Sequence, residues 1–317
     1  MTVREIPKRD PLVVFPPEEM AELIGRFTPD RIASFLDVTD LKSDTLGPKM
    51  NKLADWAKTL GCPSVCVNPV EGSDVLPSLL KGSKVKECYV MDFPLGKSDI
   101  EMKAAQTAHT IKTSRGIRGE GNGLIEIDMV INVGRFKKDP TYTAAEIETV
   151  VEAADGEHVK VIVRSAELNE EELYAVSEVV ADSRAHFIKN STGMDAFGAF
   201  PEHIRIMREV VGPDMGVKAA GGISDAMTVM RLMYAGAREE SLQRPERFRI
   251  GTSAPLNIIS TMGWLAHCTE DWVAAGINPC KICPYHHTEK QRREERELSN
   301  RRCRDCHYRE HLKHRDL

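Results

Sequence analysis

Eight short apolar segments, each followed by a segment with helical character, limit what this 317-residue chain can fold into. The apolar segments are rich in Val and Ile and nearly continuously hydrophobic, which is typical of strands buried on both faces of a parallel sheet. The expected strands are 34–38, 64–68, 87–93, 124–132, 159–164, 185–189, 215–218 and 248–251. The expected helices are 46–60, 73–81, 98–113, 142–155, 168–182, 200–211, 224–236 and 255–268.

This alternation predicts an α/β fold of the (β/α)8 TIM barrel type, in which chemistry takes place at the carboxyl ends of the strands. A doubly wound open sheet is the alternative, but no Gly-x-Gly-x-x-Gly motif follows the first strand. We expect three parts: an N-terminal leader with a short helix (1–30), the barrel (31–275) and a small metal-binding extension (276–317).

Composition narrows the class of protein further. The chain is 41% hydrophobic and 29% charged, so it can bury a large core. It contains no apolar run long enough to span a membrane, and its N-terminus lacks the apolar segment of a signal peptide. We therefore expect a cytoplasmic protein that has no membrane partner. Its eight cysteines are then expected to be thiols or metal ligands.

Lysines end two consecutive expected strands. Lys189 follows the apolar residues Phe187 and Ile188, and Lys218 ends the next strand. A lysine that leaves an apolar strand loses solvation, which lowers its pKa, and a neighbouring cation would lower it further. An amine with a lowered pKa can act as a nucleophile at neutral pH. The pattern therefore indicates amine chemistry.

The fourth expected strand carries two acids on one face, Glu126 and Asp128, because side chains two residues apart point the same way. A carboxylate within an apolar strand needs a partner, and the lysines across the barrel mouth can provide it. Lys189, Lys218 and Asp128 at three strand ends indicate a catalytic site. The alternative interpretation is a structural Lys–Asp network without chemistry.

Glycines follow the last two strands, as Gly221-Gly222 and as Gly251-Thr252-Ser253. Backbone N–H groups after strands 7 and 8 often form a phosphate site in TIM barrels. Each glycine motif alone is typical of a tight turn, but the paired position favours a phosphate site.

A set of motifs in the same order resembles the deoxyribose-phosphate aldolase family. They are 37–42 (DVTDLK), 64–69 (SVCVNP), 93–96 (FPLG), 126–132 (EIDMVIN), 187–189 (FIK), 191–193 (STG), 216–218 (GVK), 221–223 (GGI) and 249–253 (RIGTS). The resemblance implies a class I aldolase that needs no cofactor for catalysis. It would act on a small aldehyde or sugar phosphate, with 2-deoxy-D-ribose 5-phosphate as the first candidate.

The resemblance also implies roles for individual residues. Lys189 matches the lysine that forms the Schiff base, Lys218 matches the lysine that keeps the pKa of the first one low, and Asp128 matches the acid that moves protons through a water. The remaining expected substrate-binding residues are Asp37, Thr39, Cys66, Arg164, Ser191, Gly193, Gly221, Gly222, Gly251 and Ser253.

Five residues depart from the family's pattern. Asn190 stands where a threonine is usual, Met194 where some members have a lysine, and Ser224 where an arginine is usual. Arg164-Ser165 replaces Glu-Thr at the end of the fifth expected strand. Arg164 would either bind substrate or pair with Glu167 or Asp128, because arginine suits phosphate and carboxylate alike.

The extension carries a separate motif. Cys280, Cys283, Cys303 and Cys306 form a C-x2-C-x19-C-x2-C pattern, and this spacing is typical of a structural zinc site. An iron–sulfur cluster and free thiols in a disordered tail are the alternatives. Residues 280–317 hold 11 Lys/Arg and 7 Asp/Glu, with acids interleaved among the arginines. A solvated helix or a subunit contact is favoured over nucleic-acid binding.

Three functions stay open on the sequence. The first is a Schiff-base aldolase that forms a homo-oligomer, either a dimer or a tetramer. The second is a lyase or synthase of the same barrel with another aldol substrate. The third is a non-catalytic barrel whose zinc extension binds a protein or nucleic-acid partner.

Overall fold

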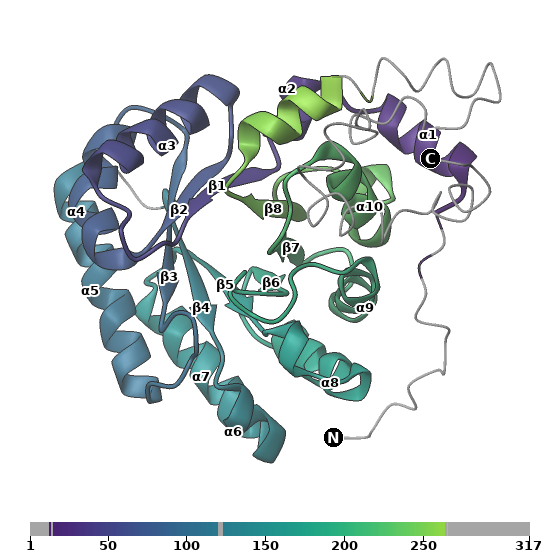
Figure 1. Ribbon diagram of the computed structural model, residues 1–317. Helices are drawn as coiled ribbons and strands as arrows, with labels where there is room; N and C mark the ends of the chain where they lie inside the picture. The colour runs from purple at the N-terminus through teal and green to yellow at the C-terminus, as the bar shows by residue number, and fades with distance from the viewer. Residues whose placement is uncertain (1–12, 14, 120–122, 264, 266–317) are drawn as a thin grey trace.

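A closed barrel of eight parallel strands in sequential order forms the centre of the molecule (Figure 1). The computed structural model describes residues 13–265, except for 14, 120–122 and 264. The strands are β1 (Leu36–Asp40), β2 (Ser64–Val67), β3 (Lys86–Met91), β4 (Ile125–Val130), β5 (His158–Ile162), β6 (Phe187–Lys189), β7 (Gly216–Ala220) and β8 (Phe248–Thr252). The pairing of β1 with β8 closes the ring. The predicted TIM barrel is therefore confirmed.

Helices surround this ring on the outside (Figure 1). They are α3 (Gly47–Leu60), α4 (Pro69–Leu80), α5 (Ile100–Arg118), α6 (Val133–Lys138), α7 (Pro140–Ala153), α8 (Glu170–Ala181), α9 (Pro201–Val211) and α10 (Ala226–Gly236). Residues 255–263 are also helical. No helix among the described residues is long and apolar enough to cross a membrane.

Each expected strand lies at the predicted place, with bounds that differ by a few residues. The differences arise at strand ends, where polar residues continue the ladder: β1 extends to Asp40, which pairs with Val67. The sequence analysis missed α6 because it is a single short helix between β4 and α7. Asn132 caps this helix by accepting a hydrogen bond from the Arg135 amide.

Two short helices precede β1, namely α1 (Pro17–Gly25) and α2 (Pro29–Ala33). The expected helix of the leader corresponds to α1, which packs against α10, and just before α1 the Phe15 ring contacts the Tyr234 ring of α10. The buried residues Leu23, Ile24 and Phe27 join this segment to the main hydrophobic core. The expected extension, with its four cysteines, lies outside the described residues.

The space inside the ring contains charged side chains in addition to apolar ones. The main hydrophobic core lies between the strands and the helices, whereas β1, β4, β5, β6, β7 and β8 each place at least one buried ionisable side chain in a shared network. Burying so many charges is costly unless each is paired and hydrogen-bonded. The network therefore marks the interior as the place to look for function.

Candidate active site

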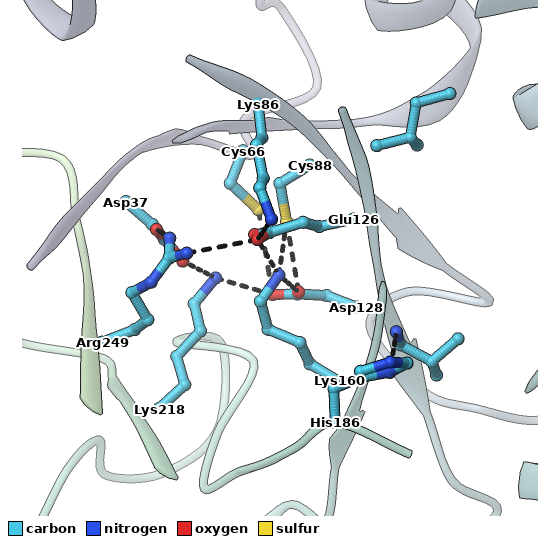
Figure 2. A network of polar contacts seen from close by, with 12 residues as sticks. Asp37, Cys66, Lys86, Cys88, Glu126, Asp128, Lys160, His186, Lys218 and Arg249 are labelled. Atoms are coloured by element: carbon cyan, nitrogen blue, oxygen red, sulfur yellow. Dashed lines mark hydrogen bonds and ion pairs between the residues drawn. The ribbon is translucent and has the colours of Figure 1, made fainter. Parts of the chain in front are cut away.

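Asp128, on β4, lies at the centre of this polar network (Figure 2). Its Oδ2 atom accepts hydrogen bonds from Lys189 Nζ at 2.7 Å and Lys218 Nζ at 2.8 Å. Its Oδ1 atom accepts one from Lys160 Nζ at 2.9 Å. Burial alone would raise the pKa of Asp128, but the charges of these three lysines outweigh it and hold that pKa well below its ordinary value. Asp128 is therefore a carboxylate at neutral pH.

Two more buried carboxylates, Asp37 and Glu126, extend the network. Asp37 pairs with Lys218 at 2.6 Å and with Arg249 at 2.6 Å. Glu126 pairs with Lys160 at 2.6 Å and with Arg249 at 3.2 Å, and Figure 2 shows Arg249 lying between the two acids. Glu126 and Asp128 both contact Lys160, which confirms that they share a face of β4.

Lys189 differs from the other cations of this network in the number of carboxylates it contacts. Lys218, Lys160 and Arg249 each pair with two carboxylates. Within the described part of the chain Lys189 pairs with Asp128 alone, and it shares that oxygen atom with Lys218. The ammonium form of Lys189 therefore has the least electrostatic support of the four.

The prediction that burial and a neighbouring lysine lower the pKa is wrong for Lys218. Burial lowers the pKa of Lys218, but Asp128 and Asp37 outweigh burial and raise that pKa well above its ordinary value. Lys218 is thus a permanent cation at neutral pH. The same balance holds the pKa of Lys160 above its ordinary range, with Asp128 as the largest favourable contributor.

Two thiols lie on the other side of Asp128. The Cys88 thiol donates to Asp128 Oδ1 at 3.1 Å, and the Cys66 sulfur lies 4.0 Å from Oδ2. The three side chains lie within 4.8 Å of one another, which is close enough to hold a metal ion. A cation there would compete with the three lysines that already bind both carboxylate oxygens. Burial also raises the pKa of Cys88 well above its ordinary value, so its thiolate is disfavoured.

The loops after β6 and β7 lie against each other at the carboxyl end of the barrel. Ser191 Oγ accepts a hydrogen bond from the Gly193 amide at 2.8 Å and lies 3.3 Å from the position that a Cβ atom on Gly221 would take. The same Cβ atom would lie 2.7 Å from the Gly198 Cα atom. Gly193 and Gly221 have φ angles of +80° and +96°, which favour glycine at both positions, and at Gly221 the close approach of Gly198 requires it as well. Ser191, Gly193 and Gly221 therefore lie close together.

The other predicted loop residues are placed less closely. A Cβ atom on Gly251 would lie 3.4 Å from Lys218 Cε, so this glycine leaves room for the lysine side chain. Gly222 and Ser253 are exposed beside the ends of β7 and β8. The Thr39 hydroxyl donates to the Asp37 carbonyl oxygen at 2.8 Å, within its own strand.

Arg164 follows β5 in a left-handed conformation, with a φ angle of +53°. Its guanidinium group pairs with Asp195 at 2.6 Å and with Glu167 at 3.5 Å. The expected alternative partner, Asp128, is instead surrounded by the three lysines. Arg164 therefore links the end of β5 to the loop after β6, where Asp195 also accepts from Thr192 Oγ1 at 3.1 Å.

Asn190, the residue after Lys189, is fully buried between the ends of two strands. Its side-chain Oδ1 atom accepts the Ala220 amide at 2.8 Å, and its own amide donates to the Lys218 carbonyl oxygen. This residue therefore fixes the spacing between the strand ends that carry the two lysines. Met194, the other departure in this loop, is 54% exposed.

Comparison with known proteins explains this arrangement. The model of the DeoC/LacD aldolase family matches residues 32–258. The chain is 40% identical over 230 residues to a deoxyribose-phosphate aldolase from Clostridium perfringens, which covers 72% of this chain and 94% of that protein. The chain belongs to the DeoC/LacD aldolase family. As a member, this aldolase is a carbon–carbon lyase of the class I type.

Two further relatives agree with this assignment. This aldolase is 39% identical over 231 residues to deoxyribose-phosphate aldolase 1 of Bacillus licheniformis, covering 72% of the chain and 95% of that protein. The tetrameric deoxyribose phosphate aldolase of Aeropyrum pernix shares the fold, with a TM-score of 0.67 at 24% identity, over 79% of this chain and 100% of that one. The family match ends before the expected metal-binding extension.

Sequence reasoning missed four members of the network: Lys86, Lys160, Arg249 and Cys88. Lys160 alternates with Val159 and Val161 in a strand, which is the same signal that drew attention to Glu126 and Asp128. Lys160 and Arg249 lie inside β5 and β8, away from the strand ends where catalytic groups of a TIM barrel are expected. Cys88 carries no distinguishing signal, because a buried cysteine is usual in an apolar strand.

Proposed function

We propose that this aldolase cleaves and forms the C–C bond of 2-deoxy-D-ribose 5-phosphate through a Schiff base on Lys189. The observation that carries the proposal is the unequal support of the lysines: Lys189 pairs with one shared carboxylate oxygen, whereas Lys218 and Lys160 pair with two carboxylates each. An amine must be free of its proton to attack a carbonyl group, and Lys189 has the fewest ion pairs to break.

The first step of the reaction is addition of the neutral Lys189 amine to the aldehyde carbon C1, followed by loss of water to give an iminium ion. Lys218 stays charged beside it, because Asp37 and Asp128 both stabilise its ammonium form. This fixed positive charge donates to Asp128 Oδ2, the oxygen atom that also pairs with Lys189 before the reaction.

Bond cleavage follows from the iminium ion. The C3 hydroxyl group loses its proton, the C2–C3 bond breaks, and its electron pair forms the enamine between C2 and C1, which releases glyceraldehyde 3-phosphate. Asp128 accepts the C3 hydroxyl proton through a water molecule, since it is the carboxylate in contact with Lys189. Protonation of C2 and hydrolysis of the second iminium ion release acetaldehyde and restore Lys189. No metal or organic cofactor enters these steps.

The phosphate group of this substrate would bind at the loops after β6, β7 and β8. Gly193, Gly221 and Gly222 all have positive φ angles there, and helix α10 begins shortly after the last of them. Backbone amides at this corner of a TIM barrel suit a phosphate group. Asp37, Thr39, Cys66, Arg164, Ser191, Gly251 and Ser253 complete the proposed substrate-binding set, with Arg164 acting through its ion pair with Asp195.

Retro-aldol kinetics test both parts of this proposal. We expect turnover of 2-deoxyribose 5-phosphate by the full chain, a much lower kcat/KM for unphosphorylated 2-deoxyribose and for a carboxylated aldol, and no turnover by Lys189→Met. Equal kcat/KM for the phosphorylated and unphosphorylated sugars would contradict the proposed phosphate site. Wild-type activity in Lys189→Met would contradict the proposed mechanism.

We further propose a division into leader (1–30), barrel (31–275) and extension (276–317), with a structural zinc ion on Cys280, Cys283, Cys303 and Cys306. The support is the C-x2-C-x19-C-x2-C spacing in the sequence. Elemental analysis of the purified full chain should find one zinc per chain, lost in Cys280→Ser/Cys283→Ser. Turnover that survives this loss would mark the extension as a separate module.

We also propose that the protein forms a homo-oligomer in the cytoplasm and has no membrane or nucleic-acid partner. The tetrameric assembly named for the Aeropyrum pernix relative supports an oligomer. Light scattering coupled to gel filtration should give a mass of two or four chains of 35.4 kDa. A mass of one chain would contradict it.

A further inference from the structure

A cavity of about 980 Å3 opens at the amino ends of the strands, at the opposite end of the barrel from the strand ends that carry Lys189 and Lys218. Its walls come from the residues that precede or begin β1, β2, β3, β5, β6, β7 and β8. A volume of this size is within the range that small-molecule sites occupy. The catalytic mechanism uses none of this space.

Cations outnumber acids around this cavity. Five lysine and arginine residues line it, against two carboxylates. One carboxylate, Asp214, is 99% exposed and lies 3.9 Å from Arg247, which is a weak contact. The cationic residues are Lys58, Lys84, Lys86, Arg247 and Arg249. Lys58, Lys86 and Arg249 pair with Asp55 and Glu126, which do not line the cavity, so Arg247 has the weakest ion pair of these four cations.

Arg247 is the clearest unused donor. Its Nε atom is buried and has no hydrogen-bond partner in the described part of the chain. Arg249, by contrast, is saturated by Asp37, Glu126 and the Pro245 carbonyl oxygen. A buried guanidinium N–H without an acceptor is costly unless a ligand or water satisfies it.

Two stacked histidines form another wall of the cavity. The rings of His158 and His186 lie 4.2 Å apart with an interplanar angle of 17°. His186 Nδ1 accepts the Val159 amide, so the remaining nitrogen of a neutral His186 ring is a donor. Burial, and after it the charge of Lys86, lower the pKa of His158 to about 4, so this ring is neutral at pH 7.

We propose that this cavity is a second ligand site, separate from the catalytic mouth, for a small molecule that bears a phosphate group. The phosphate group would accept from Arg247, His186 and Lys86, and the organic part would lie against Val85, Phe187 and Met215, which also line the walls. A guanidinium fork with further N–H donors suits phosphate oxygens, and the cavity is larger than a phosphate ion alone requires.

Lys86 connects this site to the rest of the molecule. Its ammonium group lies 3.3 Å from Glu126, which pairs in turn with Lys160, a partner of Asp128 (Figure 2). A bound anion would draw Lys86 away from Glu126. The cavity is thus in contact with the same ionic network that ends at the catalytic carboxylate.

Pyrophosphate is a suitable probe, and histidine-ring NMR of the full chain reads the site directly. We expect the His158 and His186 ring resonances, assigned with His158→Asn and His186→Asn, to shift in a saturable way as pyrophosphate is added. Arg247→Gln should weaken this binding by about tenfold or more, because it removes a charge-assisted donor.

Arg205→Gln is the matched control, since Arg205 is 23% exposed where Arg247 is 24% exposed and it does not line the cavity. It should bind pyrophosphate as wild type does, and circular dichroism should show both variants folded. Ring resonances that do not move through the millimolar range, or that move equally in Arg247→Gln, would overturn the proposal.

Discussion

The two ends of the barrel contain similar residue types and arrange them differently. At the carboxyl end, three lysines surround one carboxylate, Asp128, so that each charge has a partner at 2.7–2.9 Å. At the amino end, arginine and lysine side chains line a cavity whose acids are fewer and more exposed. The close ion pairs at the carboxyl end hold a cationic lysine beside the amine that reacts, whereas Arg247 at the amino end has an N–H group left to donate to an anion. The difference therefore separates a site for chemistry from a site for recognition.

Asp128→Asn is expected to have the largest effect, because it removes the group that pairs three buried cations. We expect activity to fall by roughly 10³-fold, within the range typical of general acid–base groups. Loss of one partner from a buried ionic network should also cost about 3–5 kcal/mol in the free energy of unfolding.

Retro-aldol kinetics and urea unfolding at pH 7 measure the two effects of Asp128→Asn. Asp214→Asn is the control, since this 99% exposed carboxylate should change stability by no more than about 0.5 kcal/mol. If Asp128→Asn were as stable as the control, the ionic network would not hold the carboxyl end together.

Lys218→Met should come next in size. Removal of this cation leaves Asp128 Oδ2 to Lys189 alone, which stabilises the ammonium form of Lys189 and reduces the fraction that can attack a carbonyl group. We expect kcat to fall on the order of 10²-fold at pH 7 and to recover partly as the pH rises. A kcat that falls by the same factor at every pH would argue against this role.

Lys160→Met is the matched comparison, because Lys160 is also fully buried and also pairs with Asp128. It binds the other oxygen atom, Oδ1, and its removal leaves Glu126 paired with Arg249 and Lys86. We expect kcat to change by less than about tenfold, with the pH profile unchanged in shape. A loss as large as that of Lys218→Met would mean that total charge, rather than the shared oxygen, controls Lys189.

The amino end should show the smallest effect, a pH dependence of stability. Burial lowers the pKa of His158 to about 4, whereas an unfolded histidine titrates near pH 6.5. The unfolded state then binds more protons between these values, so the free energy of unfolding should fall as the pH decreases from about 6.5 to about 4. The carboxylates with lowered pKa values, such as Asp128, lose their contribution only below about pH 4.

Urea unfolding at pH 7, 6, 5 and 4.5 measures how the free energy of unfolding changes with pH. His158→Asn should flatten it, while His109→Asn, a change at an exposed position on α5, should leave it as in wild type. A slope that is identical in the two variants would show that His158 is protonated at no cost to the fold.

The barrel itself could be predicted from the sequence because its strands are buried on both faces and read as apolar runs. Lys189, Lys218 and Asp128 could be found for the same reason, since a charge inside or at the end of such a run is conspicuous. The contact of the two lysines with Asp128 was expected and is present. The further members of the network could not be derived, because the shear of a closed barrel decides which strand positions meet at the centre. Lys160 and Arg249 show this, for they lie inside their strands and still reach Asp128 and Glu126.

Ion pairs between residues of different loops could not be predicted either. The ion pair of Arg164 with Asp195 joins residues 31 positions apart on two loops, and the sequence offered only the nearer Glu167 and the buried Asp128 as partners. The cavity at the amino end was also not predicted, because its walls come from seven separate strand starts. Such a surface exists only after the ring has closed.

The most direct test of the central claim is to trap the Schiff base. Full-length protein is incubated with acetaldehyde and borohydride, digested, and mapped by mass spectrometry. We expect a single reduced adduct on the peptide that contains Lys189, and none in Lys189→Met. An adduct on Lys218 or Lys160 in the wild-type protein, or no adduct at all, would contradict the assignment of Lys189 as the reacting amine.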